Sequence, residues 1–77
     1  MRRNFTKEDW KEDNVNSFVI YVKNLNNNFN AKNPRIIVEK INDDGSYSPA
    51  IIQINTLTNG DVILSTNVTF EGRFIID

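Results

Sequence analysis

The sequence contains neither cysteine nor histidine among its 77 residues. Without cysteine it forms no disulfides and no thiolate metal sites. Without histidine it has no Ser-His-Asp or Cys-His arrangement, and it lacks the side chain that most often carries acid–base catalysis near neutral pH. Its three glycines stand singly, each after an acidic residue or asparagine, so no glycine-rich phosphate loop is present. We therefore expect a protein that is not an enzyme and that uses no cofactor and no metal ion.

Long apolar runs are also missing. No run approaches the ~18 residues that a membrane-spanning helix needs. The basic start at Arg2 and Arg3 is followed by Lys7-Glu8-Asp9, where a secretory leader would place an apolar stretch. Cytoplasm is the expected compartment. Neither sign of charge is in excess: 9 basic and 10 acidic residues leave a net charge of −1, which gives little electrostatic steering of nucleic acid.

The chain is short, but it is apolar enough to fold. Its hydrophobic share is 39%, which argues against disorder. The length predicts a single domain spanning residues 1–77, with a marginal stability of about 5 kcal/mol. Because disulfides are excluded, self-association is the favoured additional source of stability.

The first part of the chain, about residues 6–30, predicts a helix. Thr6 stands in the N-cap position with Asp9 three residues later, and Phe5 and Trp10 have the spacing of a hydrophobic staple. A group of four carboxylates at residues 8, 9, 12 and 13 is interpreted as the solvated, dipole-favoured start of this helix.

Beyond this start, apolar residues recur with gaps of three and four and occupy one arc of a helix. They are Val15, Phe18, Val19, Val22, Leu25 and Phe29. Trp10 lies off this arc, so a kink or break near Asp13-Asn14 is expected. The unbroken apolar run Phe18–Val22 leaves a strand as the alternative for that part.

From about residue 35 to 77 the pattern changes to period two and predicts an antiparallel meander. Its four strands are Arg35–Ile41, Ala50–Leu57, Val62–Thr66 and Val68–Ile76, with turns at Asp43–Ser46 and Thr58–Asp61. Gly72 suggests a bulge or a tight turn. The fold class expected is α+β, with the N-terminal helix packed on one face of a four-stranded antiparallel β-meander.

One face of this meander is left over after the helix has docked. The face that should receive the helix carries Ile36, Val38, Ile52, Ile54, Val62, Leu64, Val68 and Phe70. The opposite face carries Ile37, Ile41, Ile51, Leu57, Ile63 and Ile75, more apolar residues than a solvated sheet face normally shows. A register slip at Gly72, curling of the sheet, or the segment Asn24–Asn33 folding over it would each cover this face.

The other explanation is a partner, either another protein or a second copy of the chain. We expect Ile37, Ile51, Ile63 and Tyr47 in the contact. The function predicted is a small non-catalytic protein-binding module that acts by steric occlusion. Small size, the 13 asparagines and the lack of catalytic chemistry suggest an inhibitor, immunity or anti-defence protein of phage or mobile-element type.

Two alternatives remain open. One is a nucleic-acid-binding sheet in which Arg2, Arg3, Arg35, Lys40 and Arg73 contact phosphates and Tyr47 and Phe74 stack on bases. Against it, Glu39 and Glu71 share those strands, and the basic residues do not cluster in sequence. The other alternative is a structural homo-oligomer, a subunit of a larger particle.

Overall fold

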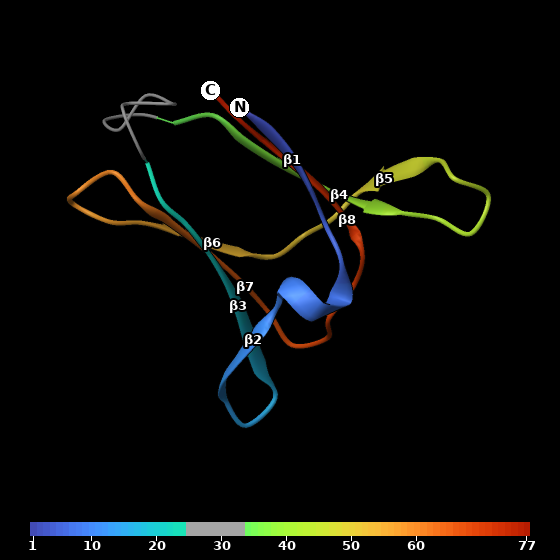
Figure 1. Cartoon of the computed structure of the whole chain (residues 1–77), viewed down its shortest axis with the longest axis horizontal. Helices are drawn as coiled ribbons and strands as arrows, with labels where there is room; N and C mark the ends of the chain where they lie inside the picture. The colour runs from blue at the N-terminus through green and yellow to red at the C-terminus, as the bar shows by residue number, and fades with distance from the viewer. Residues whose placement is uncertain (25–33) are drawn as a thin grey trace.

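The chain forms eight β-strands and one turn of 3-10 helix in a computed structural model that describes residues 1–24 and 34–77. Figure 1 shows the path of the chain through these strands and the two termini side by side. The elements are β1 (Arg2–Phe5), η1 (Lys7–Asp9), β2 (Lys11–Asn14), β3 (Ser17–Val22), β4 (Ile36–Ile41), β5 (Tyr47–Pro49), β6 (Gln53–Thr56), β7 (Val62–Thr66) and β8 (Gly72–Ile76).

The strands form two antiparallel sheets of four. The first sheet has the order β1-β8-β4-β5, and the second has the order β2-β3-β7-β6. The chain visits the sheets alternately: β1 belongs to the first, β2 and β3 to the second, β4 and β5 to the first, β6 and β7 to the second, and β8 to the first. Because β1 pairs with β8, the two ends of the chain lie next to each other.

The predicted α+β class is therefore wrong: the fold is nearly all β. The region expected to be the N-terminal helix contains β2 and β3, and no α-helix occurs in residues 1–24 or 34–77. Val15 and Asn16 form the turn between these strands, and Asn16 has the left-handed φ of 58° that asparagine tolerates. The alternative reading of Phe18–Val22 as a strand is correct. Leu25 and Phe29 lie outside the described residues.

The helix-start signals at residues 5–10 are real, but they build only one turn. The N–H of Thr6 donates to Asp9 Oδ2 at 2.8 Å, as a capping residue pair should. Phe5 and Trp10 are both buried, and their rings meet edge to face with centroids 5.5 Å apart. The chain leaves the turn at Trp10, whose backbone is extended (φ −77°, ψ 129°). The turn carries the chain from the first sheet to the second.

The predicted turns and strands of the second half are largely present. The N–H of Gly45 donates to the carbonyl of Asn42 at 2.9 Å, and the N–H of Gly60 donates to the carbonyl of Leu57 at 2.9 Å. Both glycines have a positive φ, 89° and 91°, which closes a three-residue hairpin loop in each case.

The four expected strands do not form a single meander, because they are divided between the two sheets. β4 and β8 belong to the first sheet, and β6 and β7 belong to the second. The chain crosses from β5 in the first sheet to β6 in the second at residues 50–52. It crosses back at residues 67–71, so the expected strand Val68–Ile76 shrinks to β8. Gly72 pairs in continuous register with Phe5 on one side and Lys40 on the other, without a bulge.

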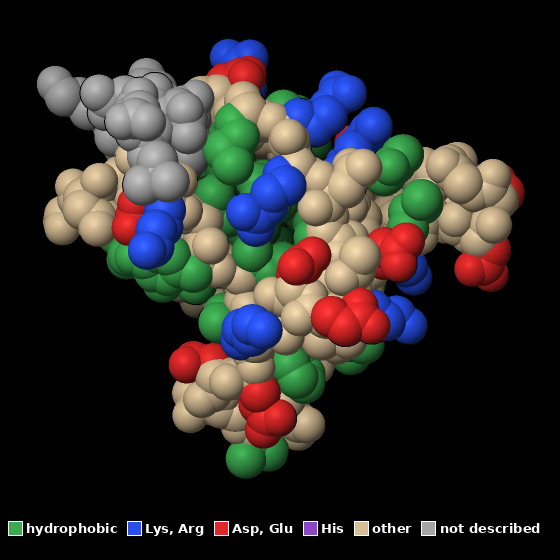
Figure 2. Space-filling model, in the orientation of Figure 1, with side chains coloured by type: hydrophobic (Ala, Val, Ile, Leu, Met, Phe, Trp, Pro, Cys, Tyr) green, Lys and Arg blue, Asp and Glu red, His purple; other side chains and the backbone are tan. Residues whose placement is uncertain are grey.

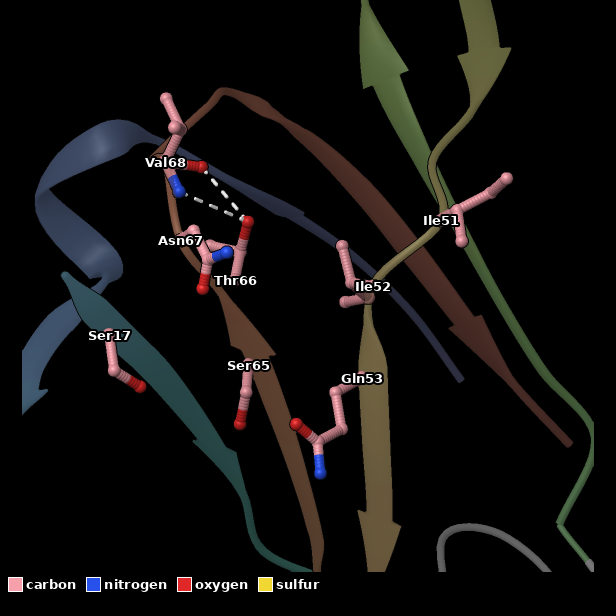
Figure 3. Close-up of a pocket in the computed structure, with 8 residues that line it drawn as sticks. All are labelled: Ser17, Ile51, Ile52, Gln53, Ser65, Thr66, Asn67 and Val68. Atoms are coloured by element: carbon pink, nitrogen blue, oxygen red, sulfur yellow. Dashed lines mark hydrogen bonds between the residues drawn. The ribbon is translucent and has the colours of Figure 1, made fainter.

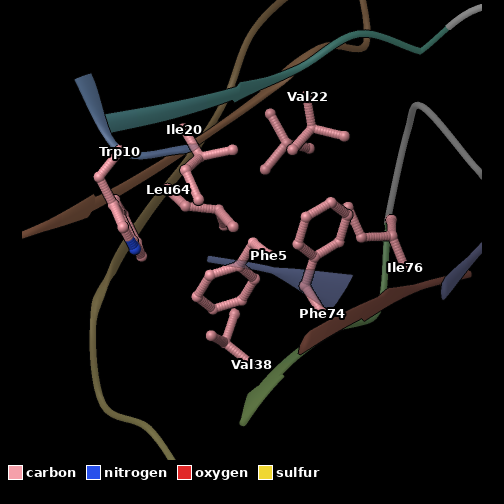
Figure 4. Close-up of a cluster of buried hydrophobic side chains, with 9 residues drawn as sticks. Phe5, Trp10, Ile20, Val22, Val38, Leu64, Phe74 and Ile76 are labelled. Atoms are coloured by element: carbon pink, nitrogen blue, oxygen red, sulfur yellow. The ribbon is translucent and has the colours of Figure 1, made fainter. Parts of the chain in front are cut away.

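The hydrophobic core lies between the two sheets (Figure 4). The first sheet contributes Phe5, Val38, Phe74 and Ile76, and the second contributes Ile20, Val22, Val62 and Leu64. Trp10 closes one side, and its Nε1 donates to the carbonyl of Phe70 at 2.8 Å. The second sheet thus covers the face that the sequence assigned to a helix. Each sheet keeps an outer face that no described element covers.

Candidate functional site

The outer face of the first sheet gathers apolar, aromatic and basic side chains in neighbouring rows. Strand register places Arg2, Ile75 and Ile37 in one row across β1, β8 and β4. The next outward row consists of Asn4, Arg73, Glu39 and Pro49, and the last contains Ile41 opposite Tyr47. Side chains alternate between the two faces of a strand, so these residues share one surface.

The apolar part of this surface is the pair Ile37 and Ile75. They lie directly opposite each other on β4 and β8. Ile37 is 47% exposed, while Ile75 is half-buried beside it. The pair is a single contiguous apolar contact area rather than two isolated exposures.

A fixed polar group borders this pair. Arg73 Nε donates to Glu39 Oε1 at 2.8 Å, and the Arg73 guanidinium lies 3.7 Å from the centroid of the Tyr47 ring. The Arg73 and Glu39 side chains are both largely covered. A guanidinium held by a carboxylate and an aromatic face has little rotamer freedom left to lose on binding.

The four predicted contact residues do not form one patch. Ile37 and Tyr47 lie on the outer face of the first sheet, but Ile63 lies on the outer face of the second sheet, paired with Tyr21 and Asn55. Ile51 is fully exposed in the crossover between β5 and β6. Alternation along each strand was predicted correctly, but all four strands were assigned to one sheet.

The five predicted phosphate contacts are divided as well. Arg2 and Arg73 face outward on the first sheet, and Arg35 extends the same side of β4, exchanging backbone hydrogen bonds with Asp77. Arg3 lies over the Phe74 ring at 4.8 Å, and Lys40 has the inward parity of its register partner Gly72. Figure 2 shows basic and acidic side chains interspersed on the face in view rather than collected in a basic stripe.

Sequence reasoning missed the roles of Glu39 and Ile75 in this surface. The sequence counts Ile75 with the apolar residues of the outer face, and it treats Glu39 only as a charge that opposes nucleic-acid binding. The signal that identifies them is cross-strand register: Glu39 lies opposite Arg73, and Ile37 lies opposite Ile75. That pairing joins residues 34 and 38 positions apart, so it is not visible in local patterns.

A second cluster, also missed, lies at the end of β3. Tyr21 Oη donates to Asp61 Oδ2 at 2.7 Å, and the N–H of Asn24 donates to Asp61 Oδ1 at 2.8 Å. The Asn24 hydrogen bond, followed by that of Tyr21, lowers the pKa of Asp61 below its usual 3.8. The bond to Asp61 raises the pKa of Tyr21 above 10.0. The cluster ties the β6–β7 turn to β3, which is a structural role.

A hollow of about 380 Å³ lies at the end of the second sheet (Figure 3). Ser17, Ser65 and Gln53 project into it from β3, β7 and β6. Thr66 Oγ1 donates to the carbonyl of Val68 at 3.0 Å at its rim. No residue lining the hollow is ionisable. Its hydroxyl and amide groups can form hydrogen bonds, but they supply no general acid or base.

Residues 1–24 and 34–77 contain no group of three or more acidic side chains placed to hold a metal ion. Within the same residues, no helix is long and apolar enough to cross a membrane.

Comparisons of the chain with protein-family models, with curated proteins and with solved structures found no match.

Proposed function

We propose that the chain is a non-catalytic protein-binding module whose binding surface is the outer face of the first sheet. The observation that supports this most directly is the arrangement of Tyr47, Arg73 and Glu39 beside the half-exposed Ile37. Tyrosine and arginine are among the residues that carry most of the energy in protein interfaces.

The arrangement favours a protein partner over a small molecule. The surface is a sheet face rather than a cavity, so it cannot enclose a ligand as an enzyme pocket does. Its anchors are held in place before binding, by a 2.8 Å ion pair and a ring contact, which lowers the entropy cost of association.

Charge around the apolar pair indicates the chemistry of the partner. Arg2 lies in the same row as Ile37 and Ile75, and Arg73 lies in the next row. Arg35 lies on the other side of Ile37, two residues earlier in the chain and on the same side of the sheet. Glu39 neutralises Arg73 directly, and Asp77 lies opposite Arg35. Arg2 is then the cation of this face that a partner can neutralise, so a partner surface with an apolar centre and a carboxylate opposite Arg2 is complementary to it. Occupying that surface would block the partner sterically, as an inhibitor or immunity protein does.

The test is affinity capture from a lysate of the encoding organism, followed by mass spectrometry. The unchanged chain should recover a protein partner. Ile37→Asp places a charge at the centre of the proposed contact, so this variant should no longer recover it. Ile63→Asp makes the same change on the outer face of the second sheet, and Val15→Asp makes it at the exposed tip of the β2–β3 hairpin. Both should leave capture intact.

Two results would overturn the proposal, and a third would show that the variants have lost their fold. Capture that survives Ile37→Asp but is lost with Ile63→Asp would move the surface to the second sheet. Loss with all three variants would indicate general destabilisation, which thermal unfolding of each variant identifies. Recovery of nucleic acid alone would favour the second candidate function.

That second candidate, a sheet that binds single-stranded nucleic acid, is supported by one observation. Arg2, Arg35 and Arg73 share the outer face with Tyr47, a combination that can hold phosphates and stack a base. The Arg73–Glu39 pair weakens this reading because it neutralises one of the three cations. Filter binding of a labelled oligonucleotide at low salt, with steep loss as salt rises, would support it, and no retention would exclude it.

A further inference from the structure

Three of the four sheet edges carry features that discourage pairing with another strand. In the first sheet, β1 places Arg2 and Arg3 at its edge, and β5 is three residues long and ends in Pro49. In the second sheet, β2 is the charged sequence Lys11–Asn14, and its register shifts between Glu12 and Asn14. Charges, proline, short length and bulges are the usual means by which proteins block sheet edges.

The fourth edge, β6, has four residues and carries no charge, no proline and no register shift. All four of its residues, Gln53–Thr56, are exposed. The chain has no charged residue between Asp44 and Asp61, and β6 contains no proline. Its register with β7 is regular from Gln53 to Thr56. No described strand lies on its other side.

The free edge of β6 presents an ordered row of backbone groups. The N–H of Leu57 donates to the carbonyl of Asp61 in β6's own hairpin. Hydrogen-bonded and non-bonded positions alternate along an antiparallel pair, so residues 53 and 55 also bond toward β7. The N–H and C=O groups of Ile54 and Thr56 therefore point away from β7, toward the position of an added strand.

Ile54 shows that the core is incompletely covered at this edge. It lies opposite Leu64, which is fully buried, so its side chain faces the space between the sheets. Even so, Ile54 is 37% exposed, because the described chain has no strand beyond β6. A strand added at this edge would cover it and remove apolar surface from water.

We infer that β6 pairs antiparallel with β6 of a second copy of the chain, about a two-fold axis at Ile54. In this register each Ile54 exchanges backbone hydrogen bonds with Ile54 of the second copy, and Thr56 lies opposite residue 52. Gln53 then lies opposite Asn55 of the second copy on the outer face, where two amides can hydrogen-bond.

Charge argues for a second copy as the occupant. A two-fold antiparallel pair sets a strand against itself, so a strand whose charges all have one sign meets like charges. β1 would oppose arginines in this way, whereas β6 opposes only neutral side chains. The joined sheet would end at the charged, irregular β2 of each copy, so assembly would stop at a dimer.

The expected dimer is weak, because one strand pair buries less than the roughly 1,200 Å² of a standard interface. The first test is therefore sedimentation equilibrium of the full chain at increasing concentration. The unchanged chain should dimerise, and Ile54→Lys should raise the dimer dissociation constant at least about tenfold, by setting two lysines face to face and removing the apolar contact. Asn4→Lys adds the same charge to the exposed edge strand β1 and should leave dimerisation unchanged.

The second test uses the absence of cysteine from the chain. Ile54→Cys places two thiols at the axis, within the Cα separation of about 4.4–6.8 Å that a disulfide allows, so mild oxidation should yield a cross-linked dimer. Asn55→Cys is one residue off the axis and should cross-link far more slowly, and Asn4→Cys should not cross-link as a pair.

Several outcomes would overturn the inference. If sedimentation equilibrium showed only monomer at the highest soluble concentration, β6 would not pair with a second copy. Equal cross-linking of all three cysteine variants would indicate random collision. If the chain were monomeric and Ile54→Lys abolished the capture of a different protein, the β6 edge would bind that protein and not a second copy. The first two results leave the proposal for the outer face of the first sheet untouched, because Ile37 and Ile54 lie on different sheets, whereas the third would count against it.

Discussion

Asp61 accepts hydrogen bonds from two points near the end of β3, Tyr21 Oη at 2.7 Å and the N–H of Asn24 at 2.8 Å. Both bonds favour the ionised carboxylate, so the pKa of Asp61 lies below 3.8 in the folded chain. A carboxylate with a depressed folded pKa contributes stability above its unfolded pKa. That contribution is lost as the pH falls below 3.8 and through the lowered value.

We therefore expect Asp61→Asn to lower the melting temperature at neutral pH and to flatten its dependence on pH below 3.8. Thermal unfolding followed from about pH 2 to pH 7 measures both effects. Tyr21→Phe is the companion variant: it removes the bond from Tyr21 and leaves those from Asn24 and Asn59, so an NMR titration should show the pKa of Asp61 moving up toward 3.8. An unchanged titration would show that the tyrosine bond is not formed in solution.

Among the elements, β8 is one of the two central strands of the first sheet, because it pairs with both β1 and β4. A Cβ at Gly72 would overlap the backbone carbonyl oxygen of Glu39 on β4. Gly72→Ala should therefore destabilise the chain by about 1–3 kcal/mol or more, as overpacking does when backbone must move. Urea unfolding measures the loss. Gly45→Asn is the matched control, since nothing lies within 4 Å of a Cβ there and asparagine tolerates its positive φ; it should cost less.

Element boundaries show how far local patterns reach. The glycine turns at Gly45 and Gly60 were predicted because a short loop needs a positive φ, a strictly local requirement. β3 was mistaken for helix because Val15, Phe18 and Val22 fit a helical stripe. In the structure Val15 is exposed in a turn, and Val22 is buried on a strand.

What decides β3 is its long-range pairing with β7, which local periodicity does not contain. The same holds for the candidate site. Outward parity placed Ile37 and Ile75 correctly on one face, but only register shows that they lie opposite each other and that Glu39 meets Arg73. The assignment of Ile63 to a different sheet from Ile37 depends on where the chain crosses at residues 50–52. Ser48-Pro49 marks a break just before the crossing, but it does not say which sheet the chain joins next.

For the whole molecule, the consequence of this topology is one core shared by two sheets. Phe74 from the first sheet and Leu64 from the second are both fully buried in the same cluster. Neither sheet can bury its apolar face alone, so the sheets should unfold together in a single transition. Strands distant in sequence pair in both sheets, β1 with β8 and β3 with β7, so folding should take milliseconds to seconds.

Trp10, the single tryptophan, reports on this cooperativity because it packs on Phe5 of the first sheet and lies at the start of β2 in the second. Its fluorescence and the far-UV circular dichroism of the strands should therefore give coincident urea transitions. Leu64→Ala should lower the free energy of unfolding by about 2–5 kcal/mol, because it opens a cavity in the shared core. Both probes should move together, although the substitution is in the second sheet. If the fluorescence transition stayed in place while the circular dichroism shifted, the two sheets would have to be independent units with separate cores, and the shared cluster could not be what stabilises the fold.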